Sequence, residues 1–445
     1  MTDTLIVGGG ITGLATAWFL RRRGIAATVL EGSGEPGGTV RTAIRAGFTV
    51  DTGPTSTLSR GGALEELIAG VELRDDVVEA DRRAPRYIVK GDRLIPLPAT
   101  LSDFLSTPLF TTRAKLRLLA EPFRRRAREE ESIAQFTRRR IGPQFLDWAV
   151  DPFVSGVYAG DPERLSVRAA VPRLYALEAR YGSLFVGALA GLFRGESGGA
   201  QPRGRLISFR RGMQTLPNAI ARALGPSLRL NTTVGAIARS GAQWIARAPH
   251  AEYRAANLIL AVPAHRAAEL LAPIDAAVAR ELSAIAYPPV ASIALGFARK
   301  QIGHTLDGFG ALLPRRLQRE TLGVIFASTL FAGRAPPDRV LLTAFIGGSR
   351  NPSAGDLDEP ELVQRVLSDL RQLLAIDGAP MFQNVTRWRH AIPQYELGHD
   401  ARIDRIDDAL TKHPGLHLRG NWRGGVSLAD CVSSADGLAR TVKNT

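Results

Sequence analysis

The chain has 445 residues, of which 45% are hydrophobic and 22% are charged, proportions that are ordinary for a folded protein with a large core and more than one domain. Its net charge is +14, because the chain has 57 lysines and arginines and 43 aspartates and glutamates. A bias toward arginine explains this charge most simply, since only five of the basic residues are lysines; an anionic lipid surface or a polycarboxylate substrate is the alternative. Nucleic acid is excluded as an expected partner, because no basic segment with interleaved aromatic residues and no nucleic-acid-binding motif is found.

Cysteine usage and hydropathy point to one compartment. Cys431 is the only cysteine, so an intrachain disulfide is excluded, which fits a reducing environment. Residues 1–10 already have the pattern of a strand and a glycine turn, which leaves no room for a signal peptide. The longest apolar run, at 183–193, is shorter than the ~18 residues of a transmembrane helix. We therefore expect a cytoplasmic protein, either soluble or peripheral at the inner face of the cell membrane.

The first segments in chain order have the pattern of a βαβ unit. An apolar run at 4–7 precedes Gly-Gly-Gly-Ile-Thr-Gly at 8–13, and a helical stretch at 14–23 precedes a second apolar run at 26–30. Strand, G-x-G-x-x-G turn, helix and strand in this order predict a dinucleotide-binding α/β domain of the Rossmann type.

Four residues of this unit have separate expected roles. Gly8 permits the tight turn, Gly10 lets the backbone approach a pyrophosphate, and Gly13 lets the helix pack on the strand. Glu31 follows the second strand, eighteen residues after Gly13, where an acid that binds the ribose is expected. The helix N-terminus then faces the phosphates with its N–H groups.

The next loop distinguishes between nicotinamide and flavin cofactors. Gly37, Gly38 and Arg41 follow Glu31 closely, and a short strand with a turn is expected at 47–55. A nicotinamide dehydrogenase would continue with regular βα alternation here. A glycine-rich loop that carries an arginine is typical of FAD proteins of the flavin amine-oxidase type, in which Arg41 can pair with phosphate or approach the flavin.

The middle of the chain changes character twice. Residues 84–98 read as a hairpin with its turn at 90–92, and helical apolar spacing then occurs at 112–128, 132–148 and 173–193. We interpret this helical part as a cap domain, and a basic amphipathic face on a membrane surface is the alternative. A Gly/Ser/Pro-rich linker is expected at 195–204.

An α/β pattern returns after the linker. Strands are expected at 228–237, 257–263 and 416–418, apolar β runs at 285–298, 310–313, 322–347 and 340–346, and helices at 358–376 and 428–442. We predict an FAD-binding domain from 1–80, 205–275 and 395–445, a substrate-binding domain from 81–98 and 276–394, and a helical cap or membrane-associating domain from 99–204.

Several segments together resemble protoporphyrinogen oxidases, the FAD-dependent enzymes of haem synthesis, and their relatives that oxidise coproporphyrinogen. The most specific matches are Gly-Val-Tyr-Ala-Gly-Asp-Pro at 156–162 and Ile-Pro-Gln-Tyr at 392–395, and others lie at 209–217, 308–314, 345–350 and 420–431. They run the length of the chain in family order. The resemblance implies an α/β (α+β) fold with a p-hydroxybenzoate-hydroxylase-like FAD domain, an inserted mixed β-sheet substrate domain and a helical, membrane-facing domain.

The resemblance also implies an activity, in which oxygen accepts six hydrogens from a porphyrinogen in three flavin cycles with release of hydrogen peroxide. It assigns cofactor contacts to Gly8, Gly10, Ile11, Thr12, Gly13, Glu31, Gly32, Gly38, Arg41, Gly53, Pro54, Thr55, Val234, Trp388, Val426, Ser427 and Leu428. It assigns substrate binding to Arg86, as a propionate anchor, and to a slot formed by Phe309, Gly310, Leu312, Ile325 and Phe345.

The chain also departs from the family pattern. Thr12 and Asp51 stand where Ser and Glu are common, and Trp422, Arg423 and Ala429 change the C-terminal flavin segment. These departures affect local contacts of the flavin and not the choice of cofactor.

The chemistry needs no catalytic side chain, because the flavin accepts the hydride and the protein positions the ring and excludes water. The seven histidines are scattered without a ligand motif, so no metal site is expected. His390 and His399 are interpreted as solvated loop residues.

Protoporphyrinogen IX is the expected substrate and coproporphyrinogen III the alternative. An amine oxidase or carotenoid desaturase, with Trp388, Tyr395 and Trp422 as aromatic groups, and a flavin-binding membrane scaffold are further alternatives. The sequence leaves open whether the chain forms a homodimer.

Overall fold

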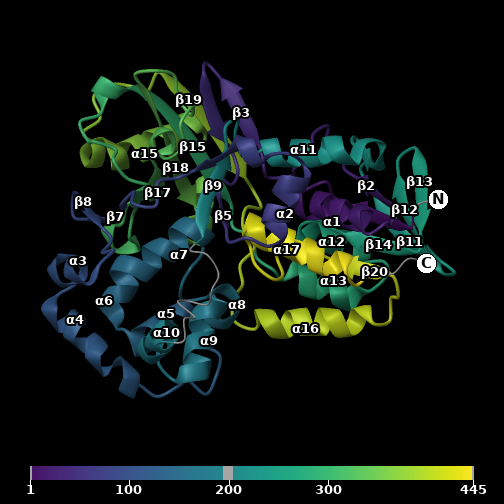
Figure 1. The fold of residues 1–445 in the computed structure, drawn as a ribbon, viewed down its shortest axis with the longest axis horizontal. Coiled ribbons are helices and arrows are strands. Elements are labelled where there is room, and N and C mark those ends of the chain that lie inside the picture. Colours follow the sequence, from purple (N-terminus) through teal and green to yellow (C-terminus); the bar gives the residue numbers. More distant parts are fainter. Residues whose placement is uncertain (1–2, 194–203, 443–445) are drawn as a thin grey trace.

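The computed structural model describes residues 3–193 and 204–442. A parallel sheet with its helices lies at one end of an elongated molecule, near both chain termini, and a larger sheet and a layer of short helices lie at the other end (Figure 1). The predicted linker at 195–204 lies, except for Gly204, outside the described residues.

The sheet at the terminal end has five parallel strands. Their order is β10 (Leu228–Arg229), β2 (Ala27–Leu30), β1 (Thr4–Val7), β14 (Asn257–Leu260) and β20 (Leu416–Leu418). The strands expected near 4–7, 26–30, 257–263 and 416–418 are confirmed. The single strand expected at 228–237 is wrong, because the chain turns at Asn231, whose φ is +53°, and a new strand begins only at Ala236. Since parallel strands share one carboxyl edge, segments far apart in sequence meet there.

Helices cover one face of this sheet, and helices with a small sheet cover the other. Ile6, Val29 and Ile259 point into a core shared with α1 (Ile11–Arg22), α2 (Ala63–Gly70), α11 (Thr215–Leu224) and α17 (Leu428–Ala439). Leu5, Val7 and Leu258 point the other way, against α12 (Ala264–Leu271), α13 (Ala276–Ser283) and the antiparallel strands β11 (Ala236–Ser240), β12 (Gln243–Ala248) and β13 (Ala251–Ala255). This three-layer arrangement confirms the α/β fold class.

The larger sheet has seven mixed strands. Their order is β19 (Phe382–Trp388), β15 (Val290–Ala298), β18 (Arg339–Gly347), β17 (Thr321–Ile325), β16 (Gly310–Leu312), β7 (Arg86–Lys90) and β8 (Arg93–Pro96). The hairpin expected at 84–98 is therefore confirmed as β7 and β8. The apolar side of α15 (Glu359–Leu374) covers one face of this sheet and forms a core with it, and the helix α16 (His399–Leu410) follows further along the chain.

Two small sheets connect the large ones. The hairpin of β3 (Thr42–Arg45) and β4 (Phe48–Asp51) packs Phe48 and Val50 against the seven-stranded sheet, on the face opposite α15. Strand β9 (Arg205–Phe209) pairs with β5 (Thr57–Ser59) and β6 (Val77–Glu79).

The helical layer consists of short pieces. They are α3 (Leu101–Ser106), α4 (Thr112–Arg117), α5 (Ile133–Arg140), α6 (Pro143–Phe145), α7 (Asp151–Tyr158), α8 (Val167–Ala170), α9 (Pro172–Tyr181) and α10 (Leu184–Phe193). The helix expected over 112–128 is wrong beyond Arg117, where α4 ends and the chain passes into a 3-10 helix, Leu118–Phe123, that contains Pro122. The other two stretches break at Gly142 and Gly182, which have φ of +106° and +74°. Among the residues described, no helix is long and apolar enough to cross a membrane.

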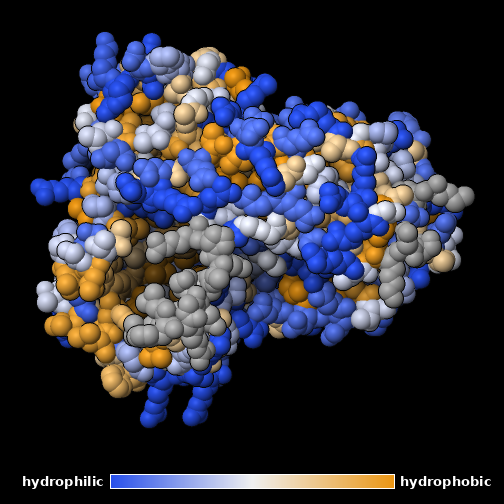
Figure 2. Space-filling view, viewed as in Figure 1, coloured by the Kyte–Doolittle hydropathy of each residue, from blue (hydrophilic) through white to orange (hydrophobic). Residues whose placement is uncertain are grey.

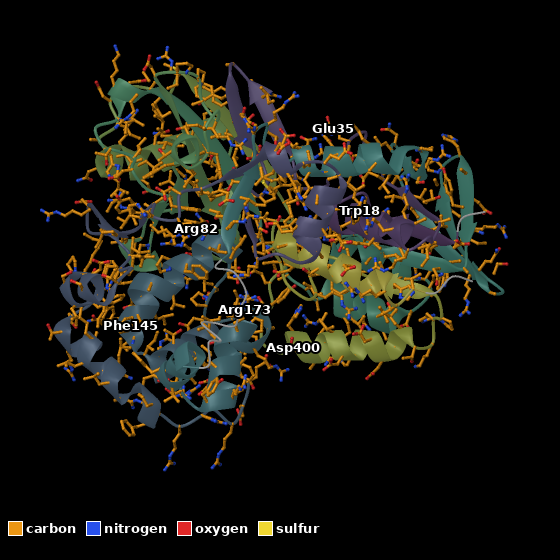
Figure 3. All side chains as sticks on the ribbon, viewed as in Figure 1. Trp18, Glu35, Arg82, Phe145, Arg173 and Asp400 are labelled. Carbon is orange, nitrogen blue, oxygen red and sulfur yellow. The ribbon has the colours of Figure 1, made fainter. Side chains whose placement is uncertain are left out.

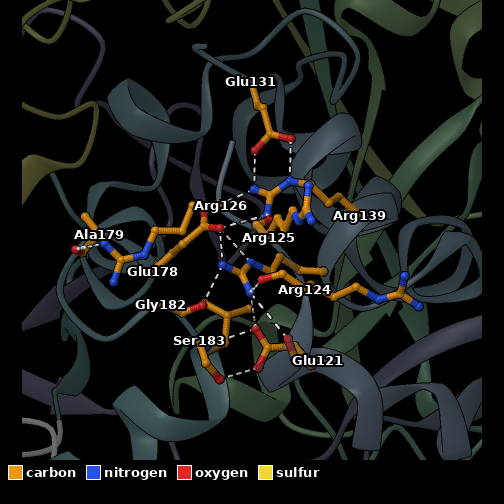
Figure 4. A network of polar contacts seen from close by, with 12 residues as sticks. Glu121, Arg124, Arg125, Arg126, Glu131, Arg139, Glu178, Ala179, Gly182 and Ser183 are labelled. Carbon is orange, nitrogen blue, oxygen red and sulfur yellow. Dashed lines mark hydrogen bonds and ion pairs between the residues drawn. The ribbon is translucent and has the colours of Figure 1, made fainter. Parts of the chain in front are cut away.

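A buried ion network holds these short helices together (Figure 4). Arg140 on α5 is fully buried, pairs with Glu178 on α9 and lies 3.1 Å from Glu121 Oε1. Glu121 in turn accepts hydrogen bonds from the backbone N–H groups of Leu184 and Phe185 and so caps the start of α10. Burial raises the pKa of Glu178, but the hydrogen bonds from Arg139 and Arg140 outweigh it and hold that pKa below its usual range.

Replacing Arg140 by Met should therefore lower the free energy of unfolding by about 3–5 kcal/mol, because the buried Glu121 loses its counter-ion and Glu178 keeps only Arg139. Arg138→Ala on the same helix is the matched control: its partner Glu163 and Arg138 itself are both about half exposed, so the loss should stay below about 1 kcal/mol. Chemical denaturation followed by circular dichroism measures both. Equal losses in the two variants would contradict the importance given to the buried network.

Candidate cofactor and substrate site

The turn after β1 allows no side chain at two of its glycines. Gly8 has φ of +107°, and a Cβ there would lie 2.5 Å from the carbonyl oxygen of Ala261. A Cβ at Gly13 would lie 2.0 Å from the Gly8 oxygen, so α1 packs directly on the turn. Gly10 caps α1 with extended backbone, and its Cβ position meets no atom within 4 Å. A tight turn, a close helix and an open position at Gly10 are the three features that a pyrophosphate at this helix N-terminus requires.

Glu31 lies beside this turn at the carboxyl end of β2. Its Oε2 accepts a hydrogen bond from Gly9 N at 2.6 Å, and its Oε1 accepts from the backbone N and the hydroxyl of Ser33, both at 2.8 Å. The carboxylate is thus fixed at the strand tip, as expected for a ribose acceptor. A Cβ at the next residue, Gly32, would lie 2.8 Å from the hydroxyl of Thr233.

The second glycine loop lies against the first. Gly37 N donates to Gly9 O at 2.8 Å, and a Cβ at Gly38 would lie 3.2 Å from the Gly10 Cα. Arg41 Nε donates to Gly38 O at 2.9 Å and its guanidinium is 3.4 Å from Glu35. The structure therefore places Arg41 beside the glycine turn that follows β1.

The loop at 52–55 closes on these elements. Gly53 approaches Thr39 so closely that a Cβ would lie 1.8 Å from its carbonyl oxygen, and the partly buried Pro54 and Thr55 follow. Trp388, at the end of β19, donates from Nε1 to Thr52 O at 2.8 Å. Val234 is buried with Val7 and Leu30 on the face of the parallel sheet opposite α1, near the carboxyl ends of the strands.

The last cofactor segment returns from the C-terminal part of the chain. Ser427 caps α17 in a capping box with Asp430, and Leu428 packs into the core of α1. The Thr12 hydroxyl interacts with the Cys431 thiol, whose pKa burial raises to about 11. The N-termini of α1 and α17 are therefore neighbours, as the binding of one extended cofactor by both helices requires. The glycine loops, Glu31, Trp388 and the start of α17 surround one edge of the sheet, and this arrangement fits FAD.

The predicted substrate slot corresponds to the face of the seven-stranded sheet opposite α15. Tyr87, Ala311 and Val324 point toward α15, so their neighbours along each strand point away from it. Two cross-strand rows result, one of Arg86, Gly310, Ile325 and Thr343 and one of Ile88, Leu312, Gly323 and Phe345. Leu312, Ile325 and Phe345 thus share a face. Figure 2 shows a hollow with an apolar floor between this sheet and the helical layer, below a band of hydrophilic side chains.

The remaining slot residues differ in what they can contact. Arg86 is exposed at the rim, with its guanidinium carbon 5.1 Å from the ring centroid of Phe309. Gly310 has φ of +143°, and a Cβ there would lie 2.1 Å from Val324 O, so this glycine is needed by the sheet itself. Leu312 already contacts α7, because a Cβ at Gly156 would lie 2.3 Å from its Cδ2.

Several residues near the site were missed or misjudged from sequence. His399 is not a solvated loop residue: it is buried at the start of α16, stacks on Tyr395 with centroids 4.2 Å apart, and burial lowers its pKa to about 4. His390 is exposed, as expected, and stacks on His265. The buried ion pair of Asp51, at the end of β4, with Arg334, 3.0 Å apart, ties the β3–β4 hairpin to the loop before β18. Pairing between distant segments gives no local sequence signal.

Two of the three aromatic residues that would suit an amine oxidase are engaged in contacts within the protein, whereas Trp388 lies at the cofactor edge. Tyr395 and Trp422 are buried, and Trp422 Nε1 donates to Val262 O at 3.2 Å. Arg423 pairs with Asp407 at 2.6 Å. Contacts within the protein therefore accommodate the residues of this segment that depart from the family pattern. Within the described part of the chain, no group of three His, Cys, Asp or Glu side chains could hold a metal ion.

The fold and the paired glycine loops define a flavin-dependent oxidoreductase. A family model described as flavin containing amine oxidoreductase matches residues 11–443. The chain therefore belongs to this family, and it is an oxidoreductase with FAD as its cofactor.

Relatives and solved structures extend over nearly the whole chain. Protoporphyrinogen oxidase 1 of Arabidopsis thaliana chloroplasts is 34% identical over 100% of this chain and 88% of its own length. Coproporphyrinogen III oxidase of Bacillus subtilis is 27% identical over 96% and 95%. A crystal structure from Exiguobacterium sp., provisionally named protoporphyrinogen oxidase, superposes with a TM-score of 0.85 at 28% identity over 99% and 98%.

Glu31→Ala should weaken FAD binding by about tenfold or more, because the ribose loses a charged acceptor at a fixed position. Glu66→Ala on the exposed side of α2 is the control and should leave affinity unchanged, since its nearest cation, Arg22, is 4.0 Å away at the surface. Flavin fluorescence during titration of the apoprotein measures both dissociation constants. Wild-type affinity in Glu31→Ala would contradict the predicted ribose contact.

Proposed function

We propose that the protein oxidises protoporphyrinogen IX to protoporphyrin IX, removing six hydrogens in three flavin cycles, with oxygen as the final acceptor and hydrogen peroxide as the by-product. The supporting observation is the apolar sheet face with an arginine at its rim, next to the edge where the glycine loops and α17 meet. Full-length relatives named for porphyrinogen oxidation support the same substrate class. Coproporphyrinogen III, the substrate in the name of the Bacillus relative, is the second candidate.

The chain's own residues supply position and shielding in this proposal. Ile325 and Phe345 present an apolar surface to the flat tetrapyrrole, and Arg86 pairs with a propionate, for which a guanidinium has the matching fork geometry. The helical layer closes the hollow from the other side and limits water. When bound, FAD would supply the hydride acceptor for a carbon that bridges two electron-rich pyrroles, and the glycine loops and the first turn of α17 would hold it next to the sheet face.

A direct assay tests this function. The FAD-loaded protein should produce porphyrin fluorescence from either porphyrinogen in air faster than autoxidation does, with three molecules of hydrogen peroxide for each porphyrin. The ratio of kcat/KM for the two substrates decides between them. Oxidation of an amine without oxidation of either porphyrinogen would overturn the proposal.

Arg86→Ala should raise KM for the porphyrinogen by about tenfold or more and leave FAD affinity unchanged, because it removes a charge-assisted contact with the substrate only. Arg93→Ala, an exposed arginine on the neighbouring strand β8, is the matched control and should keep the wild-type KM. Steady-state kinetics at saturating FAD measures both. An unchanged KM in Arg86→Ala would remove Arg86 from the substrate site.

We further propose that the protein works at the cytoplasmic face of a membrane, on which the helical layer rests. Leu101, Leu105, Leu116, Leu119 and Phe123 are between 61% and 86% exposed, and Figure 2 shows apolar side chains gathered over α3 and α4. Arg113, Arg124 and Arg125 are exposed in the same region. An apolar surface beside cationic side chains suits an anionic lipid surface.

A double variant, Leu119→Ser with Phe123→Ser, should reduce binding to phosphatidylglycerol vesicles at least tenfold, since two large apolar side chains no longer enter the lipid. Met381→Ser, which changes an exposed apolar residue just before β19 and away from the helical layer, should leave binding unchanged. Vesicle co-sedimentation gives the partition coefficients. Equal binding of the double variant and the wild type would contradict the membrane contact.

A further inference from the structure

Tyr395 connects the segment before α16 with the loop before α17. Its ring is 5% exposed, and its hydroxyl donates to Asn421 O at 2.8 Å and accepts from Gly425 N at 3.0 Å. One hydroxyl therefore satisfies one carbonyl and one N–H at opposite ends of the loop 421–425. Burial raises the pKa of Tyr395 above its usual range, so the hydroxyl keeps its proton and its role as a donor.

The loop that Tyr395 holds is anchored in its middle by the buried Trp422 and by the Arg423–Asp407 pair, and two glycines connect this anchor to α17. Gly424 and Gly425 both have positive φ, +79° and +120°, and a Cβ at Gly425 would lie 2.5 Å from the Asp430 carboxyl. Glycine is flexible in the absence of such contacts. The loop leads directly into Val426 and Ser427, at the start of α17. The position of this helix start therefore depends on the bonds that close the loop.

Tyr395 is itself fixed from the helical layer. Its carbonyl oxygen accepts from Ser166 N at 2.8 Å, and the buried Gln394 next to it donates to Tyr158 O at 2.9 Å. Glu130 accepts from Gly398 N at 2.9 Å. Three residues from separate parts of the helical layer thus fix the backbone around Tyr395.

Side chains further along the same segment strengthen this attachment. Asp400 pairs with Arg168 at 2.7 Å, and Figure 3 shows Asp400 at the end of α16 nearest the helical layer. The ring of His399, which burial keeps neutral, stacks on the Tyr395 ring with an interplanar angle of 10°. The stack on His399 and the backbone hydrogen bonds therefore fix the position of the tyrosine ring, and the ring in turn fixes the position of its hydroxyl at the loop.

We propose that Tyr395 is a positioning residue for the flavin, which fixes the loop 421–425 so that the first turn of α17 meets the flavin ring in one orientation. This inference rests on the flavin placement in the proposed function. Tyr395 touches neither cofactor nor substrate in this scheme and acts through the Gly425 N–H and the Asn421 carbonyl.

Tyr395→Phe tests the proposal, because it removes the hydroxyl and keeps the ring and its stack on His399. The FAD dissociation constant should rise about tenfold, the visible absorption bands of bound flavin should move toward those of free FAD, and the midpoint potential should shift. Tyr87→Phe is the matched control: this buried tyrosine donates to Asp307 at 2.7 Å on the α15 side of the sheet. It should keep the wild-type spectrum and potential.

Denaturation of the two apoproteins separates positioning from general stability. Similar unfolding midpoints together with a flavin change confined to Tyr395→Phe support the proposal. An unaltered flavin spectrum and potential in Tyr395→Phe overturn it, whether or not stability falls, as does an equal flavin change in Tyr87→Phe. Porphyrinogen oxidation by the wild type is measured in parallel, so that the proposed function can stand while the role of Tyr395 is rejected.

Discussion

The contact between α1 and the turn after β1 determines where the cofactor can lie. A side chain at Gly13 would lie 2.0 Å from the Gly8 oxygen, so helix and turn approach at backbone distance. This approach aims the free N–H groups of α1 at the carboxyl edge of the sheet, where they favour negative charge. The position of Glu31, the fit of the second glycine loop and the packing of α17 all follow from the direction that α1 takes.

The site is assembled from segments that are distant in sequence and tied by few polar contacts. Asp51 receives hydrogen bonds from Thr42 and Met213 and pairs with Arg334 in the loop before β18. Burial raises its pKa more than Arg334 lowers it, so this pair is retained at an electrostatic cost. Such a contact ties the hairpin of β3 and β4 to the loop before β18, in addition to the apolar packing of Phe48 and Val50 on the seven-stranded sheet.

The sequence predicted elements well where the signal is local and poorly where tertiary contacts decide. The βαβ unit, the hairpin of β7 and β8 and the helix α15 were predictable, because period, turn residues and capping agree within each segment. The helix at 112–128 gave way to a 3-10 helix that contains Pro122, and the strand at 228–237 was interrupted at Asn231, so that local backbone constraints overrode apolar spacing. The assignments of cofactor and substrate residues, and the domain limits, stay predictions. Tyr395 could not be given a role, because its two hydrogen-bond partners are backbone groups with no sequence signature.

Strand β20 completes the parallel sheet, and α17 completes the core that contains α1. Both elements come late in the sequence, which has a consequence for biosynthesis. The G-x-G-x-x-G turn leaves the ribosome early, whereas α17 begins at Leu428. At ~5–20 residues per second, about 20–80 s separate the two. During this interval the apolar side of α1 that α17 later covers is open to water or to a chaperone. Because α17 forms part of the cofactor edge, this edge is complete only after α17 has been synthesised.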